Sequence, residues 1–129
     1  MDSLWHDTLD RSEIPTSDLP AGVSFDVAVT GAGLTGLAAA VMLARSGHRV
    51  IVLEARTVGA VATGNTTAKL TLLQGTRLSD LRSRHGLETA RAYLEANAAG
   101  QRWLLETCQR AAVPVQRRPA RTHATTVDG

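Results

Sequence analysis

The stretch Gly31-Ala32-Gly33-Leu34-Thr35-Gly36 decides the fold of this chain. An apolar run, residues 25–29, precedes it and predicts a buried strand, and an Ala- and Leu-rich run, residues 37–45, follows it and predicts a helix. Gly47 predicts the end of that helix, and a second apolar run, residues 49–53, predicts a second strand. A strand, a helix and a strand within roughly 30 residues are typical of one βαβ crossover.

The three glycines have separate roles in a dinucleotide-binding fingerprint. Gly31 lets the chain turn sharply off the strand, Gly33 lets the backbone approach a pyrophosphate, and Gly36 lets the helix pack closely on the sheet. The helix N-terminus offers N–H donors and partial positive charge to the phosphates. Glu54 stands 18 positions after Gly36, where a carboxylate accepts hydrogen bonds from an adenosine 2′-hydroxyl and repels a 2′-phosphate. The pattern therefore predicts FAD or NAD as ligand and argues against NADP.

The composition is that of an ordinary globular domain. The chain has 129 residues, of which 43% are hydrophobic and 20% are charged. Residues 27–44 are uncharged over the length of a membrane span, but the fingerprint accounts for their glycines, so we predict no membrane association. A basic secretory signal is absent from the N-terminus, and we expect a cytoplasmic protein.

Other classes of function find little support in the residue types. The net charge is +2, and the basic residues near the end have no interleaved aromatic residues, which favours a solvated surface over nucleic-acid binding. Cys108 is the only cysteine, and His6, His48, His85 and His123 lack metal-ligand spacing, so no metal site is predicted. No residue is identified as a general base, and the catalytic residues stay unassigned.

Two segments outside the βαβ unit predict irregular structure. Residues 1–24 contain Pro15 and Pro20 and predict an irregular leader, from which Leu4 and Trp5 pack onto the body. Residues 55–75 are rich in Thr and Gly and predict a loop.

The part of this loop from Thr63 to Leu70 has two interpretations. Its hydroxyl and N–H groups can wrap a bound cofactor, in which case Lys69 stabilises negative charge on a reduced flavin. Alternatively, it is an ordinary polar surface loop whose lysine faces water. The residue types alone do not favour either interpretation.

Residues 78–112 predict two helical pieces that are broken at Gly86 and ended by Pro114. Residues 121–127 have the composition of a strand. Five apolar positions of the second helical piece recur at helical spacing and predict a buried face: Leu94, Ala98, Leu105, Cys108 and Ala112.

Nearly the whole chain resembles the N-terminal part of FAD-dependent oxidoreductases of the D-amino-acid oxidase (DAO) superfamily. The general resemblance is carried by residues 26–36, 52–56, 58–60 and 63–70, of which Gly64-Asn65-Thr66-Thr67-Ala68-Lys69 is the most specific. Similarity to the bacterial branch that often carries a C-terminal Rieske domain rests on Ser3-Leu4-Trp5 with Thr8 and on residues 88–97 and 122–129. Two positions depart from the family: Thr30 replaces an apolar residue, and we expect its buried hydroxyl to find a backbone acceptor, while His123 replaces an aromatic one.

The resemblance implies an α/β fold, namely the N-terminal βαβ part of a Rossmann-like FAD/NAD(P)-binding domain with an incomplete sheet, followed by helices. It implies a leader at residues 1–24, a partial FAD-binding domain at 25–116 and the truncated start of a substrate domain at 117–129. Within the FAD-binding part it implies a βαβ unit at 25–54, a cofactor loop at 55–75 and helices at 78–112. The implied cofactor is FAD, with fifteen candidate binding residues: Gly31, Ala32, Gly33, Leu34, Thr35, Gly36, Glu54, Ala55, Arg56, Thr63, Gly64, Asn65, Thr66, Thr67 and Lys69.

The implied reaction passes a hydride equivalent from an amine-like or other small substrate to flavin. Members of the family run to several hundred residues, so we expect this chain to be an N-terminal fragment that binds FAD weakly and has no turnover. Two alternatives stay open: an NAD-binding reductase module, which the same fingerprint permits, and a non-enzymatic truncated gene product. The oligomeric state is not predicted.

Overall fold

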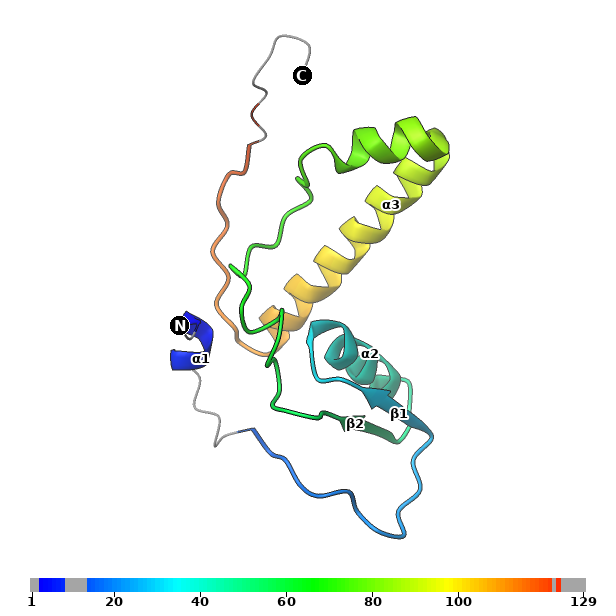
Figure 1. Ribbon diagram of the computed structural model, residues 1–129, viewed down its shortest axis with the longest axis vertical. Helices are drawn as coiled ribbons and strands as arrows, with labels where there is room; N and C mark the ends of the chain where they lie inside the picture. Colours follow the sequence, from blue (N-terminus) through cyan, green and yellow to red (C-terminus); the bar gives the residue numbers. More distant parts are fainter. Residues whose placement is uncertain (1–2, 9–13, 122, 124–129) are drawn as a thin grey trace. The chain divides into compact units, whose positions relative to one another are not determined.

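The computed structural model describes residues 3–8, 14–121 and 123. The chain divides into two compact units, Met1–Ala68 and Lys69–Gly129. The first unit contains α1 (Leu4–Thr8), β1 (Val27–Thr30), α2 (Leu34–Arg45) and β2 (Val50–Leu53), and the second contains α3 (Arg77–Arg110) (Figure 1).

The predicted βαβ unit is confirmed. β1 and β2 pair in parallel, with a register that runs from Val27 opposite Val50 to Thr30 opposite Leu53. The described residues form this one sheet of two strands, and α2 connects the strands and contacts both. The α/β class with an incomplete sheet is therefore as the sequence predicted.

Local interactions fix where these elements begin and end. The Asp26 carboxylate accepts a hydrogen bond of 2.7 Å from the Arg49 backbone N–H and joins the starts of the two strands. Gly33 is the N-cap of α2, so the helix begins at Leu34, three residues before the predicted start. Gly47 adopts a φ of +93° after the helix and lets the chain turn back toward β2.

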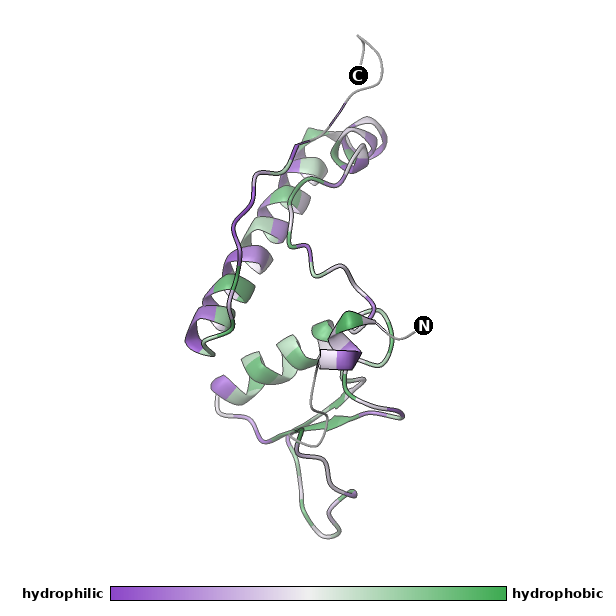
Figure 2. Ribbon diagram, turned by 90° about the vertical axis from the view of Figure 1, so that its left-hand side faces the viewer, coloured by the Kyte–Doolittle hydropathy of each residue, from purple (hydrophilic) through white to green (hydrophobic). Residues whose placement is uncertain are grey.

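Little of the first unit is deeply buried. Ala32 and Ala40 are buried there, whereas Val41 and Met42 of α2 are exposed although most of this helix is hydrophobic (Figure 2). Thr30 is exposed, so the expectation of a buried hydroxyl at this position is wrong. The reason is that residues of β1 alternate in exposure and Thr30 falls on the exposed side.

The leader differs in part from its prediction. Residues 14–24 have no helix or strand, as expected, but Leu4–Thr8 forms the short helix α1. The Thr8 hydroxyl donates to the Leu4 carbonyl at 2.8 Å and Ser3 accepts the first N–H groups of the helix turn, which stabilises this turn locally.

The second unit contains the long helix α3, which is broken at Gly86 as predicted. Gly86 has φ +84° and ψ 171°, a conformation that side chains disfavour. Polar contacts join the segment before α3 to the helix: the Tyr93 hydroxyl donates to Gln74 Oε1 at 2.5 Å, and Gln101 Nε2 donates to the Leu70 carbonyl at 3.3 Å.

The predicted buried face of α3 is only partly present. Ala98, Leu105 and Cys108 are half-buried, but Leu94 is exposed, and Ala112 lies beyond the end of the helix with a φ of +54°. The hydrogen bonds of residues 70–74 with α3 are made by side-chain amides and a phenol, and none of them covers Leu94. The predicted strand at residues 121–127 lies almost entirely outside the described residues. None of the described helices is long and apolar enough to cross a membrane.

Candidate functional site

The glycine turn has the geometry that a dinucleotide-binding fingerprint requires. Gly31 has a φ of +96° and donates its N–H to the Leu53 carbonyl at 2.7 Å, which closes the end of the sheet. A Cβ placed on Gly36 would overlap the carbonyl oxygen of Gly31 and would lie 3.4 Å from a methyl group of Val29. The close approach of α2 to the turn therefore depends on glycine at position 36.

Glu54 is joined to the glycine turn by hydrogen bonds. Its Oε2 accepts from the Ala32 N–H at 2.8 Å, and its Oε1 accepts from the Arg56 N–H at 2.9 Å. These backbone donors, Ala32 first, lower the pKa of the exposed Glu54 carboxyl below its ordinary value of 4.5. A carboxylate offers about four acceptor positions, so Glu54 can still accept from a ligand hydroxyl while it keeps both bonds.

The loop after β2 lies across the N-terminus of α2. Gly59 donates its N–H to the Ala32 carbonyl at 3.0 Å and accepts from the Gly64 N–H at 2.8 Å. Between them, Thr63 Oγ1 accepts from the Leu34 N–H at 2.9 Å, and a Cβ on Gly33 would lie 3.4 Å from this oxygen. The structure thus brings together the fingerprint, Glu54 and the first residues of the Thr-rich loop.

Residues 3–6, near the N-terminus, also reach this loop. Ser3 Oγ donates to the Gly64 carbonyl, and Trp5 Nε1 donates to the Thr66 carbonyl at 2.6 Å. A Cβ on Gly64 would overlap the imidazole of His6. Of the two residues predicted to pack onto the body, Trp5 reaches the loop through its indole N–H but stays partly exposed, and Leu4 is largely exposed. Sequence reasoning missed Ser3 and His6, and no local pattern could have found contacts between residues about 60 positions apart.

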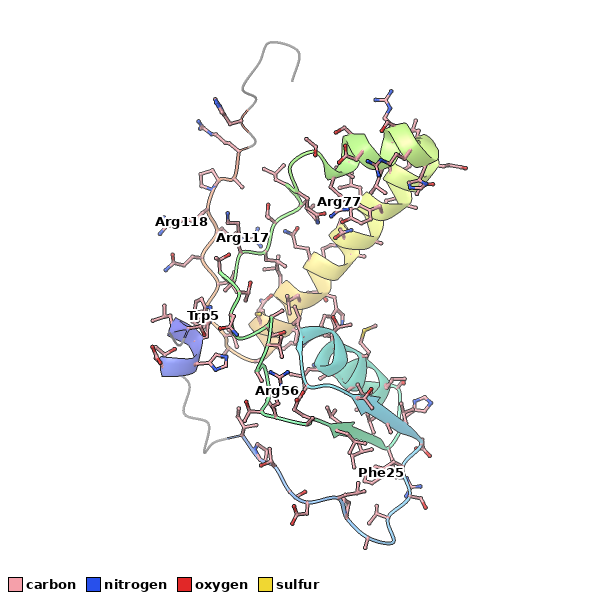
Figure 3. All side chains as sticks on the ribbon, in the orientation of Figure 1. Trp5, Phe25, Arg56, Arg77, Arg117 and Arg118 are labelled. Carbon is pink, nitrogen blue, oxygen red and sulfur yellow. The ribbon has the colours of Figure 1, made fainter. Side chains whose placement is uncertain are left out.

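The remaining candidate residues of the loop region are exposed to solvent. Asn65 Nδ2 donates to the Val61 carbonyl at 2.7 Å, and Thr66 Oγ1 accepts from the Ala68 N–H at 3.3 Å, so both stabilise the loop itself. Ala55, Arg56 and Thr67 are exposed, and Arg56 is labelled in Figure 3 together with Trp5. Lys69 is exposed and opens the second unit, and its role toward a flavin stays a prediction.

A cavity of about 930 Å³ lies beside Glu54 in the first unit. Residues 14–20 of the leader form one wall, and Ala32, Leu37 and residues 51–58 form the rest. This position, at the carboxyl end of a parallel strand, is where open α/β sheets bind ligands. Among the described residues, no group of three or more His, Cys, Asp or Glu side chains is placed to hold a metal ion.

The family model described as FAD dependent oxidoreductase (DAO) matches residues 26–128 of this chain. These residues include the glycine turn, Glu54 and the loop across α2. This chain belongs to the FAD dependent oxidoreductase family. The resemblance noted from the sequence is therefore confirmed, and flavin is the cofactor class that family membership implies.

Two curated relatives are similar to parts of the chain. The Rieske 2Fe-2S iron-sulfur protein YhfW of Bacillus subtilis (strain 168) is 33% identical over 96 residues, which are 74% of this chain and 18% of that protein. The gamma-glutamylputrescine oxidoreductase of Escherichia coli (strain K12) is 35% identical over 77 residues, which are 60% of this chain and 18% of that protein. The chain thus spans only about a fifth of the length of either relative. No solved structure matches it significantly.

The residues present fit the ADP half of FAD. Gly31 has a positive φ, a Cβ at Gly36 would overlap the Gly31 carbonyl oxygen, and Gly33 lies between them at the helix N-terminus. The turn offers backbone N–H donors at the positive end of α2, and Glu54 offers an anionic acceptor, which suits a pyrophosphate followed by a ribose.

Proposed function

We propose that this chain forms the part of an FAD-dependent oxidoreductase that holds the ADP half of the cofactor. The observation that carries the proposal is the bond between the Glu54 carboxylate and the Ala32 N–H. The bond holds the Glu54 carboxylate directly beside the glycine turn, which supports a site where a single dinucleotide reaches both.

In this proposal, each group of residues has a separate task. Residues 31–36 receive the pyrophosphate at the positive end of α2, and Glu54 accepts hydrogen bonds from the adenosine ribose. Arg56 adds positive charge after β2, next to Ala55. The loop residues Thr63, Gly64, Asn65, Thr66 and Thr67 offer hydroxyl, amide and backbone groups to the rest of the cofactor. For Lys69 we propose that it stabilises negative charge on the reduced flavin.

The chemistry that bound flavin supplies is acceptance of a hydride equivalent from the substrate. We propose an amine-like small molecule as substrate, which is supported by the name of the gamma-glutamylputrescine oxidoreductase relative. That reaction belongs to an enzyme of the relatives' length, and this chain contributes cofactor binding without turnover of its own. A cytoplasmic location is part of the same proposal.

An NAD-binding reductase module is the second candidate, because Glu54 would accept the ribose hydroxyls of NAD equally well. The two candidates differ in ligand. A site built for FAD binds FAD more tightly than NAD⁺, whereas a reductase module prefers NAD⁺.

The test is a titration of the purified chain with FAD and, separately, with NAD⁺. We expect FAD to bind weakly, and the change in its visible flavin absorbance during the titration measures the affinity. Glu54→Gln should weaken FAD binding roughly three- to tenfold, because it removes a charged acceptor for a ribose hydroxyl. Glu88→Gln, an exposed position on α3, serves as the matched control and should bind FAD like the natural chain.

Binding of NAD⁺ without FAD would replace the proposal by the reductase module. Binding of neither ligand would contradict cofactor binding by this chain. Steady-state oxidation of amines by the purified chain would contradict the statement that it has no turnover.

A further inference from the structure

We propose that the N-terminal segment of residues 3–8, here called the N-terminal clamp, positions the cofactor loop for FAD. The inference rests on the proposed function and adds positioning residues to it. Ser3 and Trp5 act through the loop residues that they hold, and neither is proposed to touch the cofactor.

Side chains of the clamp donate hydrogen bonds to two loop carbonyl oxygens that are two residues apart. Ser3 Oγ donates to the carbonyl of Gly64, and the Trp5 indole N–H donates to the carbonyl of Thr66 at 2.6 Å. Both donors are side chains, so each bond can be removed by substitution without changing the backbone. The loop contributes only main-chain oxygens, and these would be present with almost any loop sequence.

The fit at Gly64 makes the contact specific. A Cβ at this position would overlap the imidazole ring of His6 and the carbonyl oxygen of Gly59. Because the space is filled from both sides, Gly64 is held between the clamp and the loop's own backbone. This gives Gly64 a packing reason that does not depend on a ligand.

The clamped peptides are directly linked to the fingerprint. Gly64 donates its N–H to the Gly59 carbonyl, and Gly59 donates its N–H to the Ala32 carbonyl inside the glycine turn. The neighbouring Thr63 hydroxyl accepts from the Leu34 N–H at the start of α2. A displacement of residues 63–66 therefore moves Thr63 away from the helix N-terminus where the pyrophosphate is proposed to bind.

The clamp matters because the loop has little regular structure to hold it. Residues 54–68 contain no helix or strand, and ordering each such residue costs about 1–2 kcal/mol of backbone entropy. Loss of the clamp should increase local opening of the loop, while the β1–β2 ladder stays intact.

The first experiment needs no cofactor. Amide hydrogen exchange is measured for Leu34 and Gly64 in the natural chain and in the Ser3→Ala/Trp5→Phe variant. We expect exchange at both amides to be roughly tenfold faster in the variant, since two hydrogen bonds that hold the loop are lost. The control is Trp103→Phe, which changes the second tryptophan of the chain, located in α3, and should leave both exchange rates unchanged. Equal exchange rates of Leu34 and Gly64 in the clamp variant and the natural chain would overturn the proposal that the clamp holds the loop. An equal acceleration of exchange at the backbone amides of the β1–β2 ladder would overturn it as well.

The second experiment measures FAD dissociation from the same proteins. The clamp variant should release FAD roughly three- to tenfold faster, and Ser3→Thr, which keeps a hydroxyl, should behave like the natural chain. Unchanged FAD release in the Ser3→Ala/Trp5→Phe variant would overturn the positioning role. Failure of the natural chain to bind FAD would contradict the proposed function alone, because amide exchange then still decides whether the clamp holds the loop.

Discussion

A single carboxylate connects the two ends of the candidate site. Glu54 accepts from the Ala32 N–H in the glycine turn and from the Arg56 N–H in the following loop. Because only the ionised form accepts both bonds fully, the folded state favours the carboxylate, and the pKa of Glu54 lies below 4.5. The same residue that is proposed to bind a ribose therefore also stabilises the site before any ligand arrives.

This coupling predicts a pH-dependent stability. A group whose pKa is lowered on folding contributes stability above its ordinary value of 4.5, and this contribution is lost as the pH falls through the lower folded-state pKa. Urea unfolding at neutral and acidic pH should therefore show Glu54→Gln to be less stable than the natural chain at pH 7. The difference should disappear at pH values well below 4.5.

Glu88→Gln is the control for the loss of one negative charge on the surface. Its stability should follow that of the natural chain at both pH values. A deficit of Glu54→Gln that is the same at neutral and acidic pH would show that the carboxylate charge is not the cause.

At the scale of elements, the position of α2 depends on its contact with the turn that precedes it. The helix starts directly at Leu34, and Gly36 in its first turn lies against the carbonyl group of Gly31. No side chain can be accommodated there without moving either the helix or the end of β1.

Gly36→Ala should therefore lower the free energy of unfolding by about 1–3 kcal/mol, the usual cost of overpacking. Gly100→Ala is the matched control, because Gly100 lies inside α3 with open space at its Cβ position. Alanine at that position should be neutral or should stabilise the helix by about 0.5–1 kcal/mol. Urea unfolding measures both, and equal stability of Gly36→Ala and the natural chain would contradict the close contact.

The elements show how much of the fold the sequence could predict. Periodicity and glycine positions predicted both strands, α2 and the break at Gly86, because these features depend on neighbours in the chain. The exposure of Leu94 was not predictable, since a periodic apolar face does not specify what covers it. The bonds of Ser3 and Trp5 to the loop were equally inaccessible, because they join residues that are distant in sequence.

The candidate site divides in the same way. Spacing predicted Glu54 as the acid that binds the ribose, which stays a prediction, and the structure adds that its carboxylate reaches the Ala32 N–H. The proximity of Thr63 to the Leu34 N–H depends on the path of the loop from Gly59 to Gly64, which residue types do not encode. The role of Lys69 stays a prediction.

At the scale of the whole molecule, the described residues bury few side chains. Three are buried, Ala32, Ala40 and Ala90, and all are small. Neither compact unit therefore contains a core of large apolar side chains among the residues described, and we expect modest stability from burial alone.

A ligand that binds the folded first unit should raise its stability by mass action. At a concentration 100 times its dissociation constant, FAD should add about 2.7 kcal/mol and raise the midpoint of thermal unfolding. FMN, which lacks the adenosine half, is the control and should have little effect, because the proposed contacts are to the pyrophosphate and adenosine ribose. Thermal unfolding followed by circular dichroism measures both, and equal stabilisation by FMN would contradict binding of the ADP half.

The bonds already made at the glycine turn have a thermodynamic consequence for ligand capture. The Ala32 N–H is committed to Glu54, and the Leu34 N–H is committed to the Thr63 hydroxyl. A phosphate oxygen that takes the Leu34 N–H must displace this hydroxyl, which is then released to donate its own proton to the newcomer. Capture at this point thus exchanges one hydrogen bond inside the protein for two to the phosphate, and the partial positive charge at the start of α2 adds electrostatic attraction.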